Sequence, residues 1–153
     1  MADPTLTPGA TAPAFTLADQ TGTKQKLSDH KGHKVLVYFY PRADTPGCTT
    51  QSCGLRDIAS DIGDTEIIGI SPDKPDKLAK FDAKYSLGFT LLAVEDHAVA
   101  EKYGVWGEKK NYGKTYMGVE RSTVVIDADG TVKKVFRRVK PDDHAAQVLD
   151  VLR

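Results

Sequence analysis

The sequence predicts an α/β fold in which helices flank a central mixed β-sheet. Three observations carry this prediction. The chain has 153 residues, the usual length of one domain, so we treat residues 1–153 as a single unit. Residues 35–40 form an uninterrupted apolar run, which is typical of a strand buried on both faces. The expected elements follow the order β-α-β, a helical stretch, and then a β-hairpin with a final helix.

The first part of the chain supplies a hairpin, the buried strand and a helix. The tetrapeptide 19–22 lies between two short strand-like segments and is typical of a hairpin turn. The run at 35–40 is β-branched and aromatic, and Pro41 ends it because proline cannot donate to a sheet ladder. A helix is expected from Thr45-Pro46 to Gly63, since threonine favours the N-cap, proline the first helical position and glycine the end.

The rest of the chain continues with strands and helices. Residues 127–130 carry the Asp-Gly signal of a hairpin turn, and Pro141 opens a last helix with acids at its positive end. This order of elements is also that of the thioredoxin fold, with an N-terminal hairpin and a middle insertion added. The remaining expected elements are strands at 66–71, 91–94, 123–126 and 132–136 and helices around 78–85, 99–104 and 141–152.

Composition and charge narrow the possible functions. The 21 lysines and arginines balance 21 aspartates and glutamates, so no basic surplus indicates a nucleic-acid partner. The longest apolar run has six residues, whereas a bilayer-spanning helix needs roughly 20, so no membrane partner is expected. The N-terminus lacks the basic and apolar regions of a signal peptide, and we therefore expect a cytoplasmic protein.

The two cysteines are the candidate reactive groups. In a reducing compartment such a pair indicates buried packing, half of a metal site or redox chemistry. With Thr45 as N-cap, Cys48 becomes the third residue of the helix, shortly after the end of a buried strand. There a thiolate would be stabilised by free backbone N–H groups and by the helix dipole. We therefore interpret Cys48 as a reactive thiol rather than a small apolar core residue.

Cys53 follows five residues later on the same predicted helix. On an intact helix the two Cα atoms would be ~8.6 Å apart and the side chains would point ~140° apart. A disulfide needs Cα atoms within ~7 Å, so either the pair never bonds or the first turns unwind when it does. Poor helix formers between and after the cysteines favour unwinding, although core packing of Cys53 stays open. They are Thr49, Thr50, Ser52 and Gly54.

Metal binding is a weak alternative. A Cys-x4-Cys pair supplies only two ligands, and among the four histidines only His30 and His33 are close in sequence. These two lie in a polar connection. We interpret all the histidines, His97 and His144 included, as solvated surface residues, and we expect no metal.

Two motifs carry a more specific signal. The first is Pro41-x-x-x-Thr45-x-x-Cys48, inside the longer run 39–57, and the second is the block 112–123. The first resembles the active-site motif of the peroxiredoxins. Both together resemble the subfamily called bacterioferritin comigratory protein, or peroxiredoxin Q, over essentially the whole chain. Val124 departs mildly, because the family usually has phenylalanine or a similarly bulky residue there, and this touches packing rather than chemistry.

The resemblance implies a thiol peroxidase and assigns five residues. Cys48 would be the peroxidatic cysteine and Cys53 the resolving cysteine of the same chain. The hydroxyl of Thr45 would hold the peroxide, and Pro41 would shield the pocket. Arg121 would place its guanidinium over the thiolate; without the resemblance, an arginine at a strand start is an ordinary solvated charge.

The implied reaction needs no cofactor. The Cys48 thiolate would attack hydrogen peroxide or an organic hydroperoxide and become a sulfenic acid. Cys53 would then form a disulfide with it, and thioredoxin or a glutaredoxin-like protein would reduce the pair. An intramolecular disulfide removes any need for a dimer, so we expect a monomer with neither metal, haem nor flavin.

Two other classes of function remain open on the residues alone. A thioredoxin-like disulfide exchanger would normally show Cys-x-x-Cys and a proline before the hairpin strand, whereas residues 118–121 contain no proline. A redox sensor or chaperone could use the same helix opening to bind a partner. Turnover separates it from a peroxidase, because a sensor consumes about one peroxide per chain.

Overall fold

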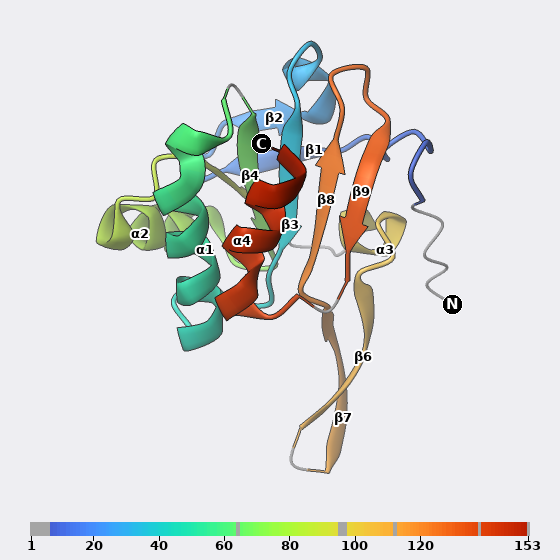
Figure 1. The fold of residues 1–153 in the computed structure, drawn as a ribbon. Coiled ribbons are helices and arrows are strands. Elements are labelled where there is room, and N and C mark those ends of the chain that lie inside the picture. The colour runs from blue at the N-terminus through green and yellow to red at the C-terminus, as the bar shows by residue number, and fades with distance from the viewer. Residues whose placement is uncertain (1–6, 64, 95–97, 112, 138, 153) are drawn as a thin grey trace.

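The structure is a computed structural model that describes residues 7–63, 65–94, 98–111, 113–137 and 139–152 (Figure 1). Its strands are β1 (Thr16–Asp19), β2 (Lys24–Lys26), β3 (Val35–Phe39), β4 (Glu66–Ser71), β5 (Thr90–Ala93), β6 (Trp106–Asn111), β7 (Lys114–Val119), β8 (Ser122–Ile126) and β9 (Val132–Phe136). Its helices are α1 (Pro46–Ile58), α2 (Pro75–Tyr85), α3 (Ala98–Lys102) and α4 (Pro141–Leu152), with 3-10 turns at Leu27–His30 and Ala59–Asp61. The predicted order is confirmed, except that β6 and β7 between α3 and β8 were not predicted.

The central sheet contains seven strands in the order β2-β1-β5-β4-β3-β8-β9. Strand β3 runs parallel to β4 and antiparallel to β8, so the sheet is mixed, as predicted. All five residues of β3 are buried, which confirms a strand covered on both faces. The loop that follows β3 therefore begins at the carboxyl end of a strand that has neighbours on both sides.

Alternate residues of β3 serve two different cores, because side chains of a strand point to opposite faces in turn. Val35, Val37 and Phe39 join the cluster that includes residues of α3. Leu36 and Tyr38 join the cluster under α1, α2 and α4, and this second cluster contains Cys48. Figure 1 shows α1 and α4 side by side on this face, with α3 behind the sheet. None of the helices in the described ranges is long and apolar enough to cross a bilayer.

Helix α1 ends earlier than the sequence predicted. The helical bonding stops at Ile58 rather than continuing to Gly63, and the chain tightens into a 3-10 turn over Ala59–Asp61. Such tightening is common in the last turn of a helix. Gly63 follows with a φ of 66°, a left-handed conformation that glycine adopts without strain, so it ends the segment as expected.

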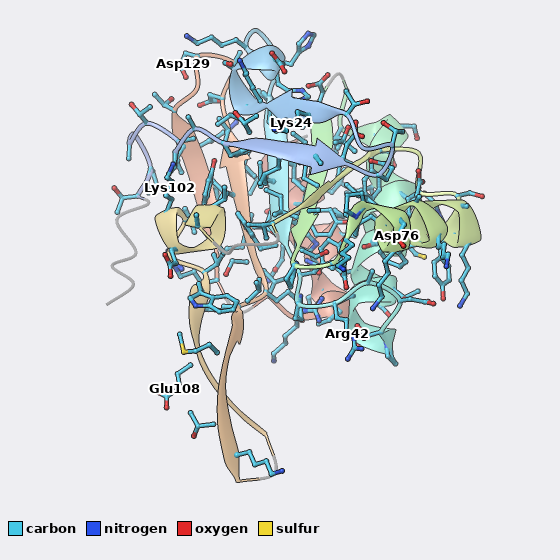
Figure 2. The ribbon with its side chains drawn as sticks, turned by 180° about the vertical axis from the view of Figure 1, so that it is seen from behind. Lys24, Arg42, Asp76, Lys102, Glu108 and Asp129 are labelled. Carbon is cyan, nitrogen blue, oxygen red and sulfur yellow. The ribbon has the colours of Figure 1, made fainter. Side chains whose placement is uncertain are left out.

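The hairpin of β6 and β7 was not predicted. It pairs Trp106 with Val119 and turns at Gly113, whose φ is 75°. Figure 1 shows this hairpin projecting away from the body, and Figure 2 shows Glu108 on it, far from the central sheet. Val119 at its base is buried in the core and Trp106 packs against it, whereas residues 107–111 show no alternating apolar pattern from which a strand could be predicted.

Gly69 on β4 lies where side chains of the neighbouring strands β3 and β5 leave no room for a side chain. An added Cβ would lie 2.8 Å from Cζ of Tyr38 and 2.9 Å from Cδ2 of Leu91, well inside ordinary carbon contact. We expect Gly69→Ala to lower the free energy of unfolding by about 1–3 kcal/mol, measured by urea denaturation. Gly107→Ala is the matched control, since nothing lies within 4 Å of its added Cβ. Equal midpoints for the two variants would contradict this account of the packing.

Candidate active site

Cys48 lies in the first turn of α1, as predicted from the N-cap and proline signals. The side chain has no exposed surface and belongs to the apolar cluster that includes Tyr38, Tyr40 and Ala43. Both cysteines are free thiols. Because the residue is covered, a peroxide reaches the sulfur only if neighbouring groups are displaced locally.

Thr45 is the N-cap by its backbone, with φ −95° and ψ 157°, but its side chain does not cap the helix. Its hydroxyl instead donates to the carbonyl of Arg42 at 2.9 Å. The sequence thus predicted the position of Thr45 correctly but not the use of its oxygen. Since the first N–H groups of a helix have no intrahelical partner, those of this turn are not satisfied by the cap and point toward any oxygen bound there.

The loop between β3 and α1 is held from two sides. Asp73 accepts a hydrogen bond from the amide of Ala43 at 2.7 Å. Asp44, whose φ of 61° is unusual for a residue with a side chain, accepts from the hydroxyl of Tyr85 at 2.8 Å and from Lys84 at 3.0 Å. The bond from Tyr85 and the bond from Lys84 lower the pKa of the Asp44 carboxyl. These contacts fix the loop that contains Pro41 and leads into the helix.

Arg121 immediately precedes β8 and reaches across to the first turns of α1. Its Nη1 donates to Oε1 of Gln51 at 2.7 Å. Its Nη2 would lie 3.1 Å from a Cβ placed on Gly47, so the glycine permits this close approach. The structure therefore brings the guanidinium to the same turn of helix as Cys48, which the residue pattern alone did not predict.

Cys53 is partly buried and packs against the same apolar cluster as Cys48. Both residues lie on an unbroken α1, so the condition for a disulfide, an unwound first part of the helix, is not met in this form. Two bonds hold this part of α1 in place. Ser52 bonds the hydroxyl of Tyr38 at 2.9 Å, and Arg56 donates to the carbonyl of Tyr85 at 2.7 Å. Burial raises the pKa of Tyr38 well above its ordinary value, so the phenol stays neutral.

The interpretation of His144 as a solvated residue is wrong. It is fully buried, with Nε2 2.6 Å from the hydroxyl of Thr123 and Nδ1 3.3 Å from Nε2 of Gln51. A signal for its burial exists in the sequence, because His144 precedes Val148 and Leu152 at intervals of four residues on the inner face of α4.

The remaining histidines do not all lie on the surface. His30 is mostly buried and pairs with Glu66, so it too departs from the expected surface position. His33 is exposed, as expected, and His97 lies outside the described residues. Within the described ranges, no three His, Cys, Asp or Glu side chains are grouped so that they could hold a metal ion.

Gln51 and Ser52 are site residues that the sequence reasoning missed. With Cys48 and Leu55 they form the buried face of α1, at the helical spacing i, i+3, i+4, i+7. Two polar residues on a buried face imply hydrogen-bond partners, and this was the available signal. Val124, the departure from the family pattern, is buried in the other cluster, on the face away from Cys48, which agrees with a role in packing.

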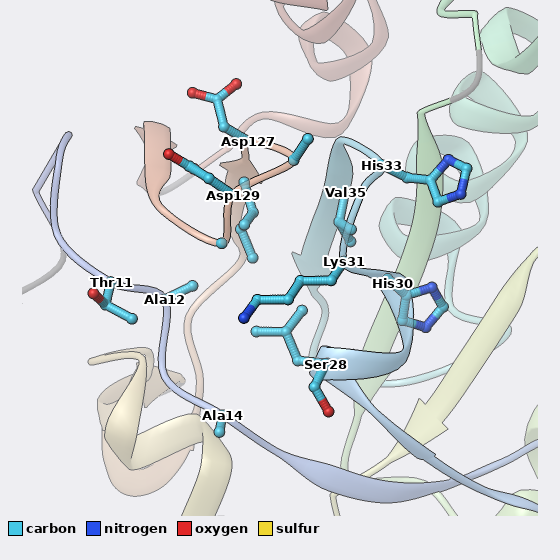
Figure 3. A pocket seen from close by; sticks show the side chains of 14 residues that line it. Thr11, Ala12, Ala14, Ser28, His30, Lys31, His33, Val35, Asp127 and Asp129 are labelled. Atoms are coloured by element: carbon cyan, nitrogen blue, oxygen red, sulfur yellow. The ribbon is translucent and has the colours of Figure 1, made fainter.

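A surface hollow of about 190 Å³ lies at the opposite end of β3 from Cys48 (Figure 3). Its lining includes Val35 at the start of β3, Ile126 at the end of β8, and Lys31, which extends into it in the figure. None of the residues predicted to carry chemistry lines this hollow.

A mixed sheet with a buried cysteine in the first turn of the following helix defines a thiol enzyme of thioredoxin-like fold. The model of the AhpC/TSA family matches residues 8–135, and the chain belongs to this family. The relatives of the chain in this family are peroxiredoxins. The predicted family, thiol peroxidase class and fold are thereby confirmed.

The curated relatives place the chain in the bacterioferritin comigratory protein, or peroxiredoxin Q, subfamily. It is 53% identical over 150 residues to a putative peroxiredoxin bcp of Haemophilus influenzae, covering 97% of each chain. It is 50% identical over 150 residues to peroxiredoxin Bcp of Escherichia coli K12, covering 97% of this chain and 96% of the relative.

Solved structures agree. A bacterioferritin comigratory protein of Xanthomonas campestris, described as having alkyl peroxide reduction activity, superposes with a TM-score of 0.87 at 34% identity, covering 98% of this chain and 97% of the other. Peroxidoxin BcpB of Mycobacterium tuberculosis gives a TM-score of 0.85 at 38% identity, covering 97% of each chain.

Proposed function

We propose that this peroxiredoxin reduces hydrogen peroxide and organic hydroperoxides through Cys48, as part of antioxidant defence. The observation that carries the proposal is the placement of Cys48 in a helix turn whose N–H groups are not capped and which Arg121 approaches. The alkyl peroxide activity of the Xanthomonas relative supports the inclusion of organic substrates.

In the first step the Cys48 thiolate attacks one peroxide oxygen and an S–O bond forms as the O–O bond breaks. The sulfur is oxidised to a sulfenic acid, and the other oxygen leaves as water or an alcohol once it takes up a proton. Charge develops on the departing oxygen, and donors already in place stabilise it best. The first-turn N–H groups and Arg121 are our candidates, and the Thr45 hydroxyl can join them once its proton leaves the Arg42 carbonyl, while Pro41 shields the site from water.

In the second step the Cys53 thiolate attacks the sulfenic sulfur of Cys48, the S–S bond forms as the S–O bond breaks, and the departing hydroxide takes up a proton from solvent to leave as water. The intact α1 holds the two residues too far apart, so this step requires unwinding of the helix between them. Thioredoxin or a glutaredoxin-like dithiol protein then reduces the disulfide by exchange. We infer a monomer that works in the reducing cytoplasm without a metal, haem or flavin.

A thioredoxin-coupled assay tests the proposal. Purified protein, thioredoxin and thioredoxin reductase are mixed with hydrogen peroxide or tert-butyl hydroperoxide, and NADPH consumption is followed. We expect many turnovers per chain with both substrates. Consumption of about one peroxide per chain would instead indicate a sensor, and no consumption with either thioredoxin or a glutaredoxin would overturn the recycling scheme.

Gly54 offers a test of the unwinding step. It has helical backbone geometry within α1, and alanine stabilises a helix interior by ~1 kcal/mol over glycine. If this stability is lost on opening, Gly54→Ala should slow disulfide formation roughly fivefold while leaving the attack on peroxide unchanged. Rapid quench with thiol alkylation measures both phases.

The control for this variant follows from the packing of α1 on α4. An added Cβ at Gly54 would lie 3.3 Å from Cβ of Ala145, a tight contact that offsets part of the gain if α4 cannot shift. The double variant Gly54→Ala, Ala145→Gly removes that contact and should show the full slowing. An unchanged resolving rate in the double variant would mean that opening does not limit the step.

A further inference from the structure

A buried chain of hydrogen bonds runs behind Arg121 and links three elements. Nη1 of Arg121 donates to Oε1 of Gln51 on α1 at 2.7 Å. The amide nitrogen of Gln51 lies 3.3 Å from Nδ1 of His144 on α4, and Nε2 of His144 lies 2.6 Å from the hydroxyl of Thr123 on β8. Gln51, His144 and Thr123 are at most 1% exposed, so water does not compete for these groups.

The arginine fixes the direction of every bond in this chain. A guanidinium has only donors, so the atom of Gln51 that faces Arg121 must be the carbonyl oxygen. The other end of the side chain is then the amide NH₂ group, which donates to Nδ1 of His144. Nδ1 must therefore be unprotonated, and the neutral imidazole carries its proton on Nε2 and donates it to Thr123.

We propose that Gln51 and His144 are positioning residues that hold the Arg121 guanidinium at the turn bearing Cys48. A glutamine side chain alone has free rotamers, and its amide can present either end to the arginine. With Nδ1 of His144 as an acceptor, the reversed orientation is opposed at both ends, because the amide oxygen would face a second acceptor and the NH₂ group would face the donors of Arg121. This inference rests on the proposed roles of Cys48 and Arg121.

The same bond ties α1 to α4 at the segment that must unwind. Gln51 lies between Cys48 and Cys53, so opening of the helix has to break its bonds to His144 and to Arg121. The chain of bonds thus favours the folded form in which the attack occurs and opposes the open form in which the disulfide forms. Its loss should change the rates of the two steps in opposite directions.

Two substitutions of His144 separate its two ring nitrogens. His144→Asn places an oxygen near the position of Nδ1 and keeps an acceptor for Gln51, but loses the bond to Thr123. His144→Gln places its amide near the position of Nε2 and keeps a partner for Thr123, but leaves Gln51 without its acceptor. Each variant is compared with the unsubstituted chain by rapid kinetics, and circular dichroism verifies that it is folded.

We expect His144→Gln to lower the rate constant for attack on hydrogen peroxide about tenfold. Loss of an outer residue that orients a functional group through a hydrogen bond typically has an effect of this size. Disulfide formation should become about fivefold faster, as for the loss of one hydrogen bond. His144→Asn should restore both rates to within about threefold of the unsubstituted chain. Equal effects of the two variants, or a larger effect of His144→Asn, would overturn the proposal.

Nitrogen NMR of the imidazole gives an independent measurement that does not depend on activity. At neutral pH the His144 ring should carry its proton on Nε2, and a proton on Nδ1 would overturn the proposed direction of the bonds. The measurement also separates two failures. If the unsubstituted chain does not reduce peroxide, the proposed function fails, whereas the tautomer still tests the orientation of Gln51. His144→Leu, which lacks both nitrogens, serves if neither polar variant folds.

Discussion

Replacing Cys48 by serine is expected to reduce peroxide turnover to the uncatalysed background, a loss of at least about 10³-fold. A serine hydroxyl is not ionised near neutral pH, so it is a much weaker nucleophile than a thiolate. The helix turn and Arg121 can stabilise charge, but they cannot replace a thiolate as the nucleophile. NADPH consumption in the thioredoxin-coupled assay measures this loss.

The matched variant Cys53→Ser should behave differently. It retains Cys48 and its surroundings, so it should consume about one peroxide per chain and then stop as the sulfenic acid. A sulfenic-acid-specific reagent followed by mass spectrometry identifies the modified residue. Because Cys48 is fully buried, Cys48→Ala is prepared beside Cys48→Ser, and circular dichroism verifies that each is folded. Near-normal turnover by a folded Cys48 variant would end the assignment.

The parts of the site predicted from the sequence are those set by local signals. Thr45 and Pro46 placed the start of α1, and hence the position of Cys48, because capping preferences act over a few adjacent residues. The apolar run at 35–40 identified the strand that leads to it. These features need no knowledge of what lies across the fold.

The parts that were missed depend on partners distant in the sequence. The Gln51–His144 contact spans 93 residues, and the Arg121–Gln51 contact spans 70. A buried glutamine or histidine looks like a surface residue until helix periodicity is applied to it, and even then its partner comes only from the packing of α1 against α4. The β6–β7 hairpin was missed for a different reason: only its base, at Trp106 and Val119, joins the core, and residues 107–111 show no alternating apolar pattern.

The same buried histidine makes the stability of the fold depend on pH. Burial, and secondarily the charge of Arg121, lower the pKa of His144 from 6.5 to about 4. The remaining polar groups against it, Gln51, Thr123 and the Tyr38 ring, are neutral in this form. Between the two pKa values the unfolded chain binds a proton that the folded chain does not. The contribution of His144 to the free energy of unfolding is therefore unchanged above about pH 6.5 and falls as the pH decreases toward 4.

This difference is expected to lower the free energy of unfolding by about 2 kcal/mol between pH 7 and pH 5, measured by urea denaturation. Carboxyl groups contribute little in this window; the pKa of Asp19, for example, is raised by burial but lowered overall by hydrogen bonds from Thr21 and Gln25, so it titrates at lower pH. His144→Asn cannot take up the proton and serves as the control. It should lose about 2 kcal/mol less than the unsubstituted chain over the same range. Parallel pH dependences for the two proteins would show that His144 is protonated in the folded form, and would contradict its burial as a neutral acceptor for Gln51.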